Sequence, residues 1–422
     1  MQRASLILFL KLCMVFMTLI AAGSFELLKD GGATSEAFQE SVREYSGVFS
    51  FVVPVWLLLG YLTCAIGVIG RWRRFKISKH ELLWVVYVLI SMLSLAWVLD
   101  LYFALRSFLI CVLCILLAFV SSRYLTADEF IKFIARLTLF VLVSSVLVAM
   151  FIPSYGVSIG EHEGKWQGIF RHKNALGNFA AMGFCIFLSS LYRRINFLAL
   201  VGILLSSIVT IKTQSFTAVA VILSGSIFFS FFLFRLRWRS SYVLGGLAGV
   251  LLCIACISLV WLSIEGLAVN IFGKDTTFSN RNIIWGHYFQ QAAESPLWGR
   301  GFDQLVIYAQ EYYSEYRQAM GFIVGAAHNG FLELYFNQGV IGLFVFLCLI
   351  LNFIGMSYSP VRWLFVLGGL FLVSFIVTNT FESRLIGLNV HFVYFVMLYW
   401  FFVCGRLELR NNKYGVTVLG VK

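Results

Sequence analysis

The stretch that decides the architecture begins Ser279-Asn-Arg281-Asn-Ile-Ile-Trp285 and belongs to a polar segment that runs from Ile264 to about Tyr335. It is the only long polar segment between apolar runs, with Arg281 near its start and His328 near its end. Apolar stretches precede it and follow it. A chain this hydrophobic that retains one long polar insert is expected to carry out its chemistry there.

The composition is that of an integral membrane protein. Of the 422 residues, 60% are hydrophobic and 12% are charged, against about 25% charged in a typical soluble domain. The net charge of +12 does not indicate nucleic-acid binding, because the basic residues lie in short clusters between apolar runs rather than along one face. The nine cysteines all lie in apolar runs, so disulfides do not hold the polar loops.

Twelve apolar runs are long enough to cross a bilayer as helices, which need about 20 residues each. The predicted fold is therefore an all-α integral membrane protein, a single polytopic domain over residues 1–422 with about 12 transmembrane helices. The runs are 4–23, 48–70, 82–99, 103–122, 134–152, 175–192, 196–212, 216–234, 242–263, 336–355, 362–380 and 387–404.

Lysine and arginine are distributed unevenly between the two sides of this arrangement. With both termini in the cytoplasm, 19 of the 32 basic residues lie on the inner side, 12 on the outer side, and Lys11 inside the first run. An excess of Lys and Arg in cytoplasmic loops is the usual determinant of orientation. Residues 264–335 and the shorter loop 153–174 are therefore predicted to face outward. Residues 124–136 are predicted to form an amphipathic helix on the inner surface.

Within the long loop, the sequence predicts two helices before the next span. The first begins near Arg281, with Ser279 as its N-cap, and ends before Pro296. The second covers about 303–319 and presents several tyrosines on a face suited to lipid or to sugar. His328 then opens a helix that enters the membrane.

Arg281 and His328 are candidate catalytic residues because of their residue types and positions. A guanidinium at a helix N-terminus suits a phosphate or diphosphate, and an imidazole near the bilayer surface can take a proton from a hydroxyl at neutral pH. Such a pair fits glycan transfer from a lipid diphosphate. In the short loop, Arg171, His172 and Lys173 either meet water or an anion at the mouth of a cavity or serve as an interfacial anchor. No cluster on the outer face has metal-ligand spacing, so no metal is expected.

Three motifs lie in the segments predicted to face outward. They are Gly168-Ile-Phe-Arg171-His172-Lys173-Asn174-Ala-Leu-Gly177, Arg281-Asn-Ile-Ile-Trp285 followed by Ser295-Pro-Leu-Trp-Gly-Arg300-Gly301-Phe, and Ala327-His328-Asn329-Gly-Phe-Leu-Glu333 leading to Gly339-Val-Ile-Gly342. In this order they resemble the O-antigen ligase and polymerase superfamily, which includes exopolysaccharide polymerases, and Glu382 also fits. The resemblance covers residues 168–385, whereas the first 150 residues are similar only in hydropathy.

The resemblance implies a GT-C-type glycosyltransferase of the bacterial inner membrane that uses undecaprenyl-diphosphate-linked glycans on the periplasmic face, without a metal or another cofactor. By this analogy, Arg281 would hold the diphosphate and His328 would activate or orient the acceptor, which is a lipid-linked glycan or lipid A core. The other assigned residues would bind the donor, namely Arg171, His172, Lys173, Asn174 and Asn329, or support the site, namely Ser215, Trp285, Arg300, Glu333 and Glu382.

Two functions within the superfamily stay open. Ligases tend to carry a further arginine in a Thr/Ser-Arg pattern after the seventh helix, whereas this chain has Lys212-Thr-Gln-Ser215-Phe-Thr217, closer to the exopolysaccharide polymerase pattern. Polymerisation of O-antigen or exopolysaccharide repeat units is therefore favoured, and ligation to lipid A core is the alternative. A polysaccharide or lipid transporter would be expected to show internal repeats, which the sequence lacks. A sensor or structural protein would use the loop only to bind a partner.

Overall fold

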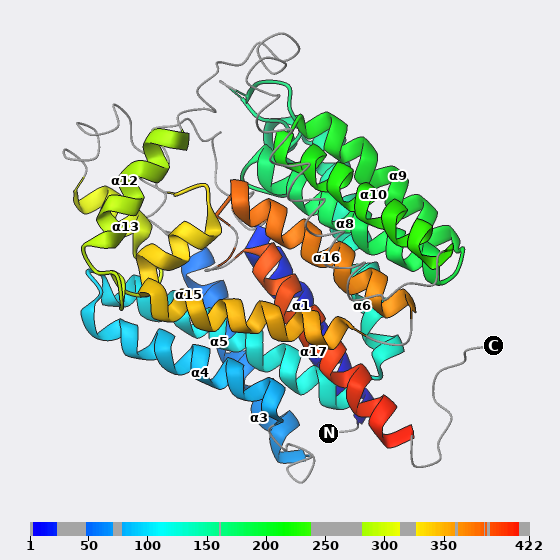
Figure 1. Ribbon diagram of the computed structural model, residues 1–422, viewed down its shortest axis with the longest axis horizontal. Helices are drawn as coiled ribbons and strands as arrows, with labels where there is room; N and C mark the ends of the chain where they lie inside the picture. The colour runs from blue at the N-terminus through cyan, green and yellow to red at the C-terminus, as the bar shows by residue number, and fades with distance from the viewer. Residues whose placement is uncertain are drawn as a thin grey trace.

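The computed structural model describes residues 3–22, 48–70, 78–159, 162–237, 281–312, 326–358, 362–383, 385 and 389–412. Its helices are α1 (Arg3–Ala22), α3 (Val48–Gly70), α4 (Lys79–Leu93), the 3₁₀ helix η3 (Ser94–Trp97), α5 (Leu101–Tyr124), α6 (Ala127–Phe151), α7 (Pro153–Gly156), α8 (Lys173–Arg193), α9 (Phe197–Thr213), α10 (Phe216–Arg237), α12 (Arg281–Ala293), α13 (Leu305–Glu311), α15 (Gly330–Ser357), α16 (Arg362–Phe381) and α17 (Val390–Asn412). In Figure 1, α8, α9 and α10 lie together on one side, and α12 and α13 lie on the other.

The predicted all-α membrane class is confirmed. Within the described residues, nine helices are long and apolar enough to cross a membrane, and two shorter apolar helices, Phe197–Thr213 and Val390–Gly405, accompany them. These helices account for eleven of the twelve predicted runs, and the run 242–263 lies outside the described residues. The exact number of spans stays a prediction.

Residues 124–136 do not form a separate surface helix, so this prediction was wrong. Helix α6 begins at Ala127 and continues to Phe151. Thr126 and Glu129 form a capping box that fixes its start: the Glu129 side chain accepts from the Thr126 backbone N–H at 2.8 Å, and the Thr126 hydroxyl accepts from the Glu129 backbone N–H at 3.2 Å. The polar residues after this cap are the first turns of a long helix, because no glycine or proline interrupts it.

Helix α17 forms the centre of the bundle. Every residue from Val390 to Cys404 is buried, as expected for a helix that is apolar nearly all round. The ring of Phe395 stacks on that of Phe375 in α16 with 4.7 Å between centroids. Tyr399 meets Trp84 of α4 edge-on at 5.3 Å. These aromatic contacts join helices that are far apart in the sequence into one core.

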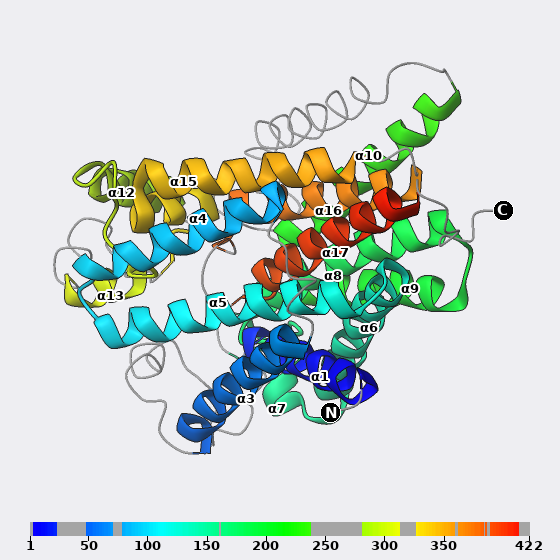
Figure 2. The same ribbon diagram turned by 90° about the horizontal axis from the view of Figure 1, so that it is seen from below.

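The connector between α12 and α13 packs against a bend in α15. The bend is at Gly339, which has φ 65° and ψ −167° and lies so close to the backbone of Leu297 that a Cβ there would be 2.3 Å from it. Three backbone hydrogen bonds of 2.8 Å hold the two segments together: Arg300 N to Phe336 O, Gly301 N to Asn337 O, and Val340 N to Pro296 O. Figure 2 shows the consequence, with α12 and α13 lying together at the same end of the bundle as the first turns of α15.

A buried amide fixes the start of α13. Oδ1 of Asn337 accepts hydrogen bonds from the backbone N–H groups of Gln304 at 2.8 Å and Leu305 at 3.2 Å. Oε1 of Gln304 accepts in turn from the backbone N–H groups of Leu99 at 2.9 Å and Asp100 at 3.1 Å. Because buried polar groups are costly to leave unpaired, these bonds hold α13, α15 and the turn before α5 as one unit.

Asp303, just before α13, should limit stability at neutral pH. Its φ of 56° is in the left-handed region, which asparagine tolerates better than most residues. Burial raises the pKa of its carboxyl to about 6, although a hydrogen bond from Ser107 opposes the shift. The folded state therefore holds the proton more tightly than the unfolded state between pH 3.8 and about 6, so this group's contribution to stability falls as the pH rises through that range.

We expect Asp303→Asn to raise the melting temperature of the detergent-solubilised protein at pH 7 by about 2–5 °C. The amide keeps the shape of the side chain and has no charge to bury. Scanning fluorimetry at pH 7 and pH 4.5 checks this, and the advantage of the variant should shrink at the lower pH, where the wild-type carboxyl is protonated. A lower melting temperature for the variant at pH 7 contradicts the prediction.

Candidate functional site

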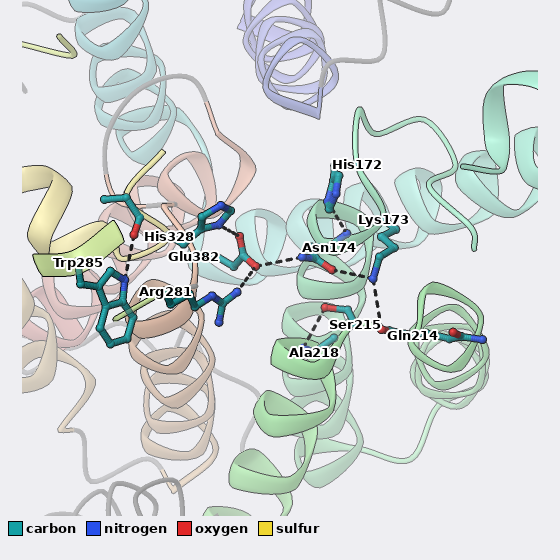
Figure 3. A network of polar contacts seen from close by, with 11 residues as sticks. His172, Lys173, Asn174, Gln214, Ser215, Ala218, Arg281, Trp285, His328 and Glu382 are labelled. Atoms are coloured by element: carbon teal, nitrogen blue, oxygen red, sulfur yellow. Dashed lines mark hydrogen bonds and ion pairs between the residues drawn. The ribbon is translucent and has the colours of Figure 1, made fainter. Parts of the chain in front are cut away.

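Glu382 is the centre of a polar network that joins three distant parts of the chain (Figure 3). Its Oε1 accepts hydrogen bonds from Nη2 of Arg281 at 3.2 Å and from Nδ2 of Asn174 at 3.2 Å. Its Oε2 lies 3.3 Å from Nδ1 of His328. The two residues predicted to be catalytic are thus brought together by a carboxylate that was assigned only a supporting role.

The network is shielded from water to different degrees. The side chain of Glu382 is 5% exposed and that of Arg281 is 14% exposed, whereas 33% of the His328 side chain remains accessible. Burial lowers the pKa of Arg281, and the nearby charge of Glu382 opposes this shift. A buried carboxylate between a guanidinium and an imidazole is stabilised by both, so removal of any member leaves an uncompensated polar group. The imidazole is the most accessible of these three side chains.

Arg281 and His328 are held by the elements around them. Arg281 is the first residue of α12, and Nε1 of Trp285, one turn later, donates to the carbonyl of Ala327 at 3.0 Å. This bond ties α12 to the residue before His328. Oδ1 of Asn329 caps α15 by accepting from two backbone N–H groups, both at 3.1 Å. His328 itself has φ 48°, a conformation that non-glycine residues adopt rarely and that often marks a functional position.

The beginning of α8 supplies the third arm of the network. His172 is the N-cap of this helix, and its Nδ1 accepts from the backbone N–H of Asn174 at 3.1 Å. The buried ammonium of Lys173 donates to Oδ1 of Asn174 at 3.3 Å and to the carbonyl oxygen of Gln214 at 3.5 Å. Asn174 therefore links a lysine to Glu382. Polar contacts thus run from Lys173 through Asn174 and Glu382 to Arg281 and His328.

Arg171 adds a second guanidinium beside the start of α8. Its side chain is exposed, yet burial lowers the pKa to about 10. The pKa stays far above 7, so Arg171 is charged under physiological conditions. Arg171, Lys173 and Arg281 make this region electropositive, which suits an anionic ligand.

Four other predicted residues have local structural contacts. Ser215 accepts from the backbone N–H of Ala218 at 3.4 Å at the start of α10, and Glu333 lies in the first turn of α15. Asn329 uses its side-chain oxygen as the cap described above. Arg300 donates to the carbonyl of Gln291 and forms an ion pair with Glu294. The polar contacts described for these residues do not extend to Glu382.

Sequence reasoning missed Glu382 as the centre of the site and Gln214 as the acceptor for Lys173. A lone glutamate directly after an apolar run is a signal, but nothing local tells which distant groups it meets. Among the residues that the structure describes, no group of three or more His, Cys, Asp or Glu side chains is arranged to hold a metal ion. The cysteines at 111 and 114 are buried and unbonded to one another, and those at 253 and 256 lie outside the described part of the chain.

Two comparisons with known proteins bear on the site. A family model described as O-antigen ligase matches residues 201–347, a region that includes Arg281 and His328. An exopolysaccharide production protein, ExoQ of Rhizobium meliloti (strain 1021), is 27% identical over 117 residues, which are 26% of this chain and 24% of that protein. The match thus spans about a quarter of this relative's length. Together these matches confirm the predicted resemblance to the O-antigen ligase and polymerase superfamily.

Proposed function

We propose, from this confirmed resemblance, that the chain is a metal-independent GT-C-type glycosyltransferase that moves glycan from an undecaprenyl-diphosphate donor. The observation that carries the proposal is the contact of Glu382 with both Arg281 and His328, two residues inside the matched region. The most suitable reaction is polymerisation of O-antigen or exopolysaccharide repeat units. Transfer of the glycan to lipid A core is the second candidate, because the matching family is described as a ligase.

The proposed mechanism assigns the role of base to His328. A carboxylate can only accept hydrogen bonds, so in the neutral imidazole of His328 the hydrogen is on Nδ1, which faces Glu382, and Nε2 is the nitrogen that can accept a proton. The acceptor hydroxyl attacks C1 of the donor sugar and gives its proton to Nε2. The bond between C1 and the diphosphate oxygen breaks, and its electron pair leaves with undecaprenyl diphosphate.

Arg281 stabilises the leaving group in this mechanism. Glu382 takes a hydrogen bond from Nη2 only, whereas a guanidinium has five N–H donors in a planar fork. Arg281 also begins α12, where the helix dipole favours an anion. Charge that develops on the diphosphate as the bond breaks therefore meets a fixed cation and needs little reorganisation.

Arg171, His172, Lys173 and Asn174 form the proposed donor entrance. Their positive charge attracts the diphosphate, and Asn174 connects this entrance to Glu382 by a 3.2 Å hydrogen bond. In the predicted topology, Lys and Arg are in excess on the side of the membrane opposite to these residues, which supports a periplasmic site. Both termini are then in the cytoplasm, and the chain lies in the inner membrane. Residues 153–174 and 264–335 are then the periplasmic loops, in a single membrane domain.

Incubation of the purified protein with a lipid-diphosphate-linked glycan alone tests the proposal. A polymerase should produce longer lipid-linked chains, seen as a ladder after electrophoresis, because donor and acceptor are then the same kind of molecule. A ligase should give no product until lipid A core is added. Chelator in the buffer should leave either reaction unchanged. Absence of any product with both acceptors contradicts the proposed function.

A further inference from the structure

A hollow outside the Glu382 network opens beside the connector of α12 and α13. Its volume is about 540 Å³, within the range of about 300–1,000 Å³ that is usual for ligand pockets. One wall comes from the end of α4 and from η3, and the other from the connector and α13. Residues that line it include Leu93, Trp97, Ser295, Trp298, Arg300 and Tyr308.

Aromatic rings dominate its walls. The rings of Trp97 and Trp298 meet edge-on with 6.2 Å between centroids, and the residues are 38% and 51% exposed. The guanidinium of Arg300 lies 5.4 Å from the ring centre of Tyr308. Indole rings combine a flat apolar face with an N–H donor, so they bind molecules that present both C–H groups and hydroxyls.

The charge in this hollow is compensated. Arg300 forms an ion pair with Glu294 and donates to the carbonyl of Gln291 at 3.2 Å. An anionic headgroup or a diphosphate would compete with Glu294 for the same guanidinium. A neutral molecule rich in hydroxyls needs no such exchange, because it can bond to the Arg300 donors that the pair leaves unused.

The hollow has a fixed relation to the candidate active site. The backbone N–H of Arg300 donates to the carbonyl of Phe336 in α15, and His328 lies just before the same helix. Phe336 is six positions after Gly330, which is about 9 Å along a helix axis. The buried side chain of Asn337, next in α15, caps α13 on the other wall. The walls are therefore preorganised rather than assembled around a ligand.

We infer that this hollow, the Trp97–Trp298 pocket, binds a neutral sugar residue of the glycan chain at a distance from the reacting unit. The inference rests on the proposed function for the identity of its ligand. A sugar ring lies against the indole of Trp298, and its hydroxyls bond to Arg300 and to the indole N–H groups. The pocket keeps an extended glycan in register with His328 while the next transfer takes place.

Binding of a soluble glycan tests this inference without the need for turnover. The probe is the oligosaccharide released by mild acid from the cell's own lipid-diphosphate-linked glycan, and its binding to purified protein is measured by calorimetry. We expect Trp298→Ala to weaken binding about tenfold or more, whereas Trp298→Phe should restore most of it. Phe289→Ala is the matched control, because Phe289 is 59% exposed on α12 and does not line the pocket. Equal melting temperatures establish that each variant is folded.

The outcomes separate this inference from the proposed function. Wild-type binding that Trp298→Ala removes supports the pocket, even where the protein transfers no glycan. Binding that survives Trp298→Ala, or no binding to the wild-type protein, overturns it, even where transfer is observed. Contact of Trp298 with lipid would overturn the inference as well. The fluorescence of Trp298 is the difference between the emission of wild type and that of Trp298→Phe, and in nanodiscs that contain brominated phosphatidylcholine it should be the same as without bromine. Quenching by bromine would place Trp298 against acyl chains.

Discussion

Replacement of Glu382 by glutamine is expected to lower the turnover of glycan transfer by about 10²–10⁴-fold, with a smaller change in the apparent affinity for donor. The amide has the same shape as the carboxyl group but carries no charge. It therefore no longer compensates buried Arg281, and it can present an N–H instead of an acceptor to Nδ1 of His328. The imidazole then loses its fixed tautomer, and Nε2 is no longer held ready as the base.

The measurement is the initial rate of lipid-linked glycan extension by the purified protein, at several donor concentrations. Asp128→Asn is the matched control, since this carboxyl forms ion pairs with Lys132 and Arg193 at the start of α6, where exposure makes such pairs weak. It should retain nearly all activity. Turnover of Glu382→Gln within about threefold of wild type, in protein that elutes as a single species, would remove Glu382 from the mechanism.

The sequence was sufficient to find the ends of the network but not its centre. Arg281 and His328 could be predicted because each is a polar residue at the start of a helix in the one long hydrophilic insert. Glu382 is 101 positions from Arg281, 54 from His328 and 208 from Asn174. Periodicity describes one helix at a time, so it carries no information on which helices bring such distant positions together.

The start of α15 was within reach of sequence reasoning. His328 was predicted to open the helix that continues into the apolar run 336–355, and α15 begins at Gly330 with Asn329 as its cap. The role of a single polar residue is harder to predict. Ser215 was assigned to the site by resemblance, and its hydroxyl accepts a backbone hydrogen bond at the start of α10. Its role in the site stays a prediction. Local capping chemistry and site chemistry use the same polar residues, and only the three-dimensional arrangement distinguishes them.

Arg281→Lys should retain positive charge and still lose about 10²-fold in turnover, and Arg281→Ala should lose about 10³-fold. Lysine offers a compact ammonium without the planar fork, so it cannot hold Glu382 and two diphosphate oxygens at once. The same assay of glycan extension measures both variants. Arg193→Lys is the control, because Arg193 is 33% exposed, pairs with Asp128, and lies in the last turn of α8, at the opposite end of that helix from Asn174.

A double variant decides whether Arg281 and Glu382 act as one unit. If they do, Arg281→Ala combined with Glu382→Gln should be no slower than the slower single variant, because the second substitution removes an interaction that is already lost. Losses that multiply instead would mean that the two residues contribute independently, and the 3.2 Å contact between them would then be a structural ion pair beside the reaction rather than part of it. Thermal stability of the same four proteins separates these cases, since a purely structural pair should lower the melting temperature in proportion to the lost activity.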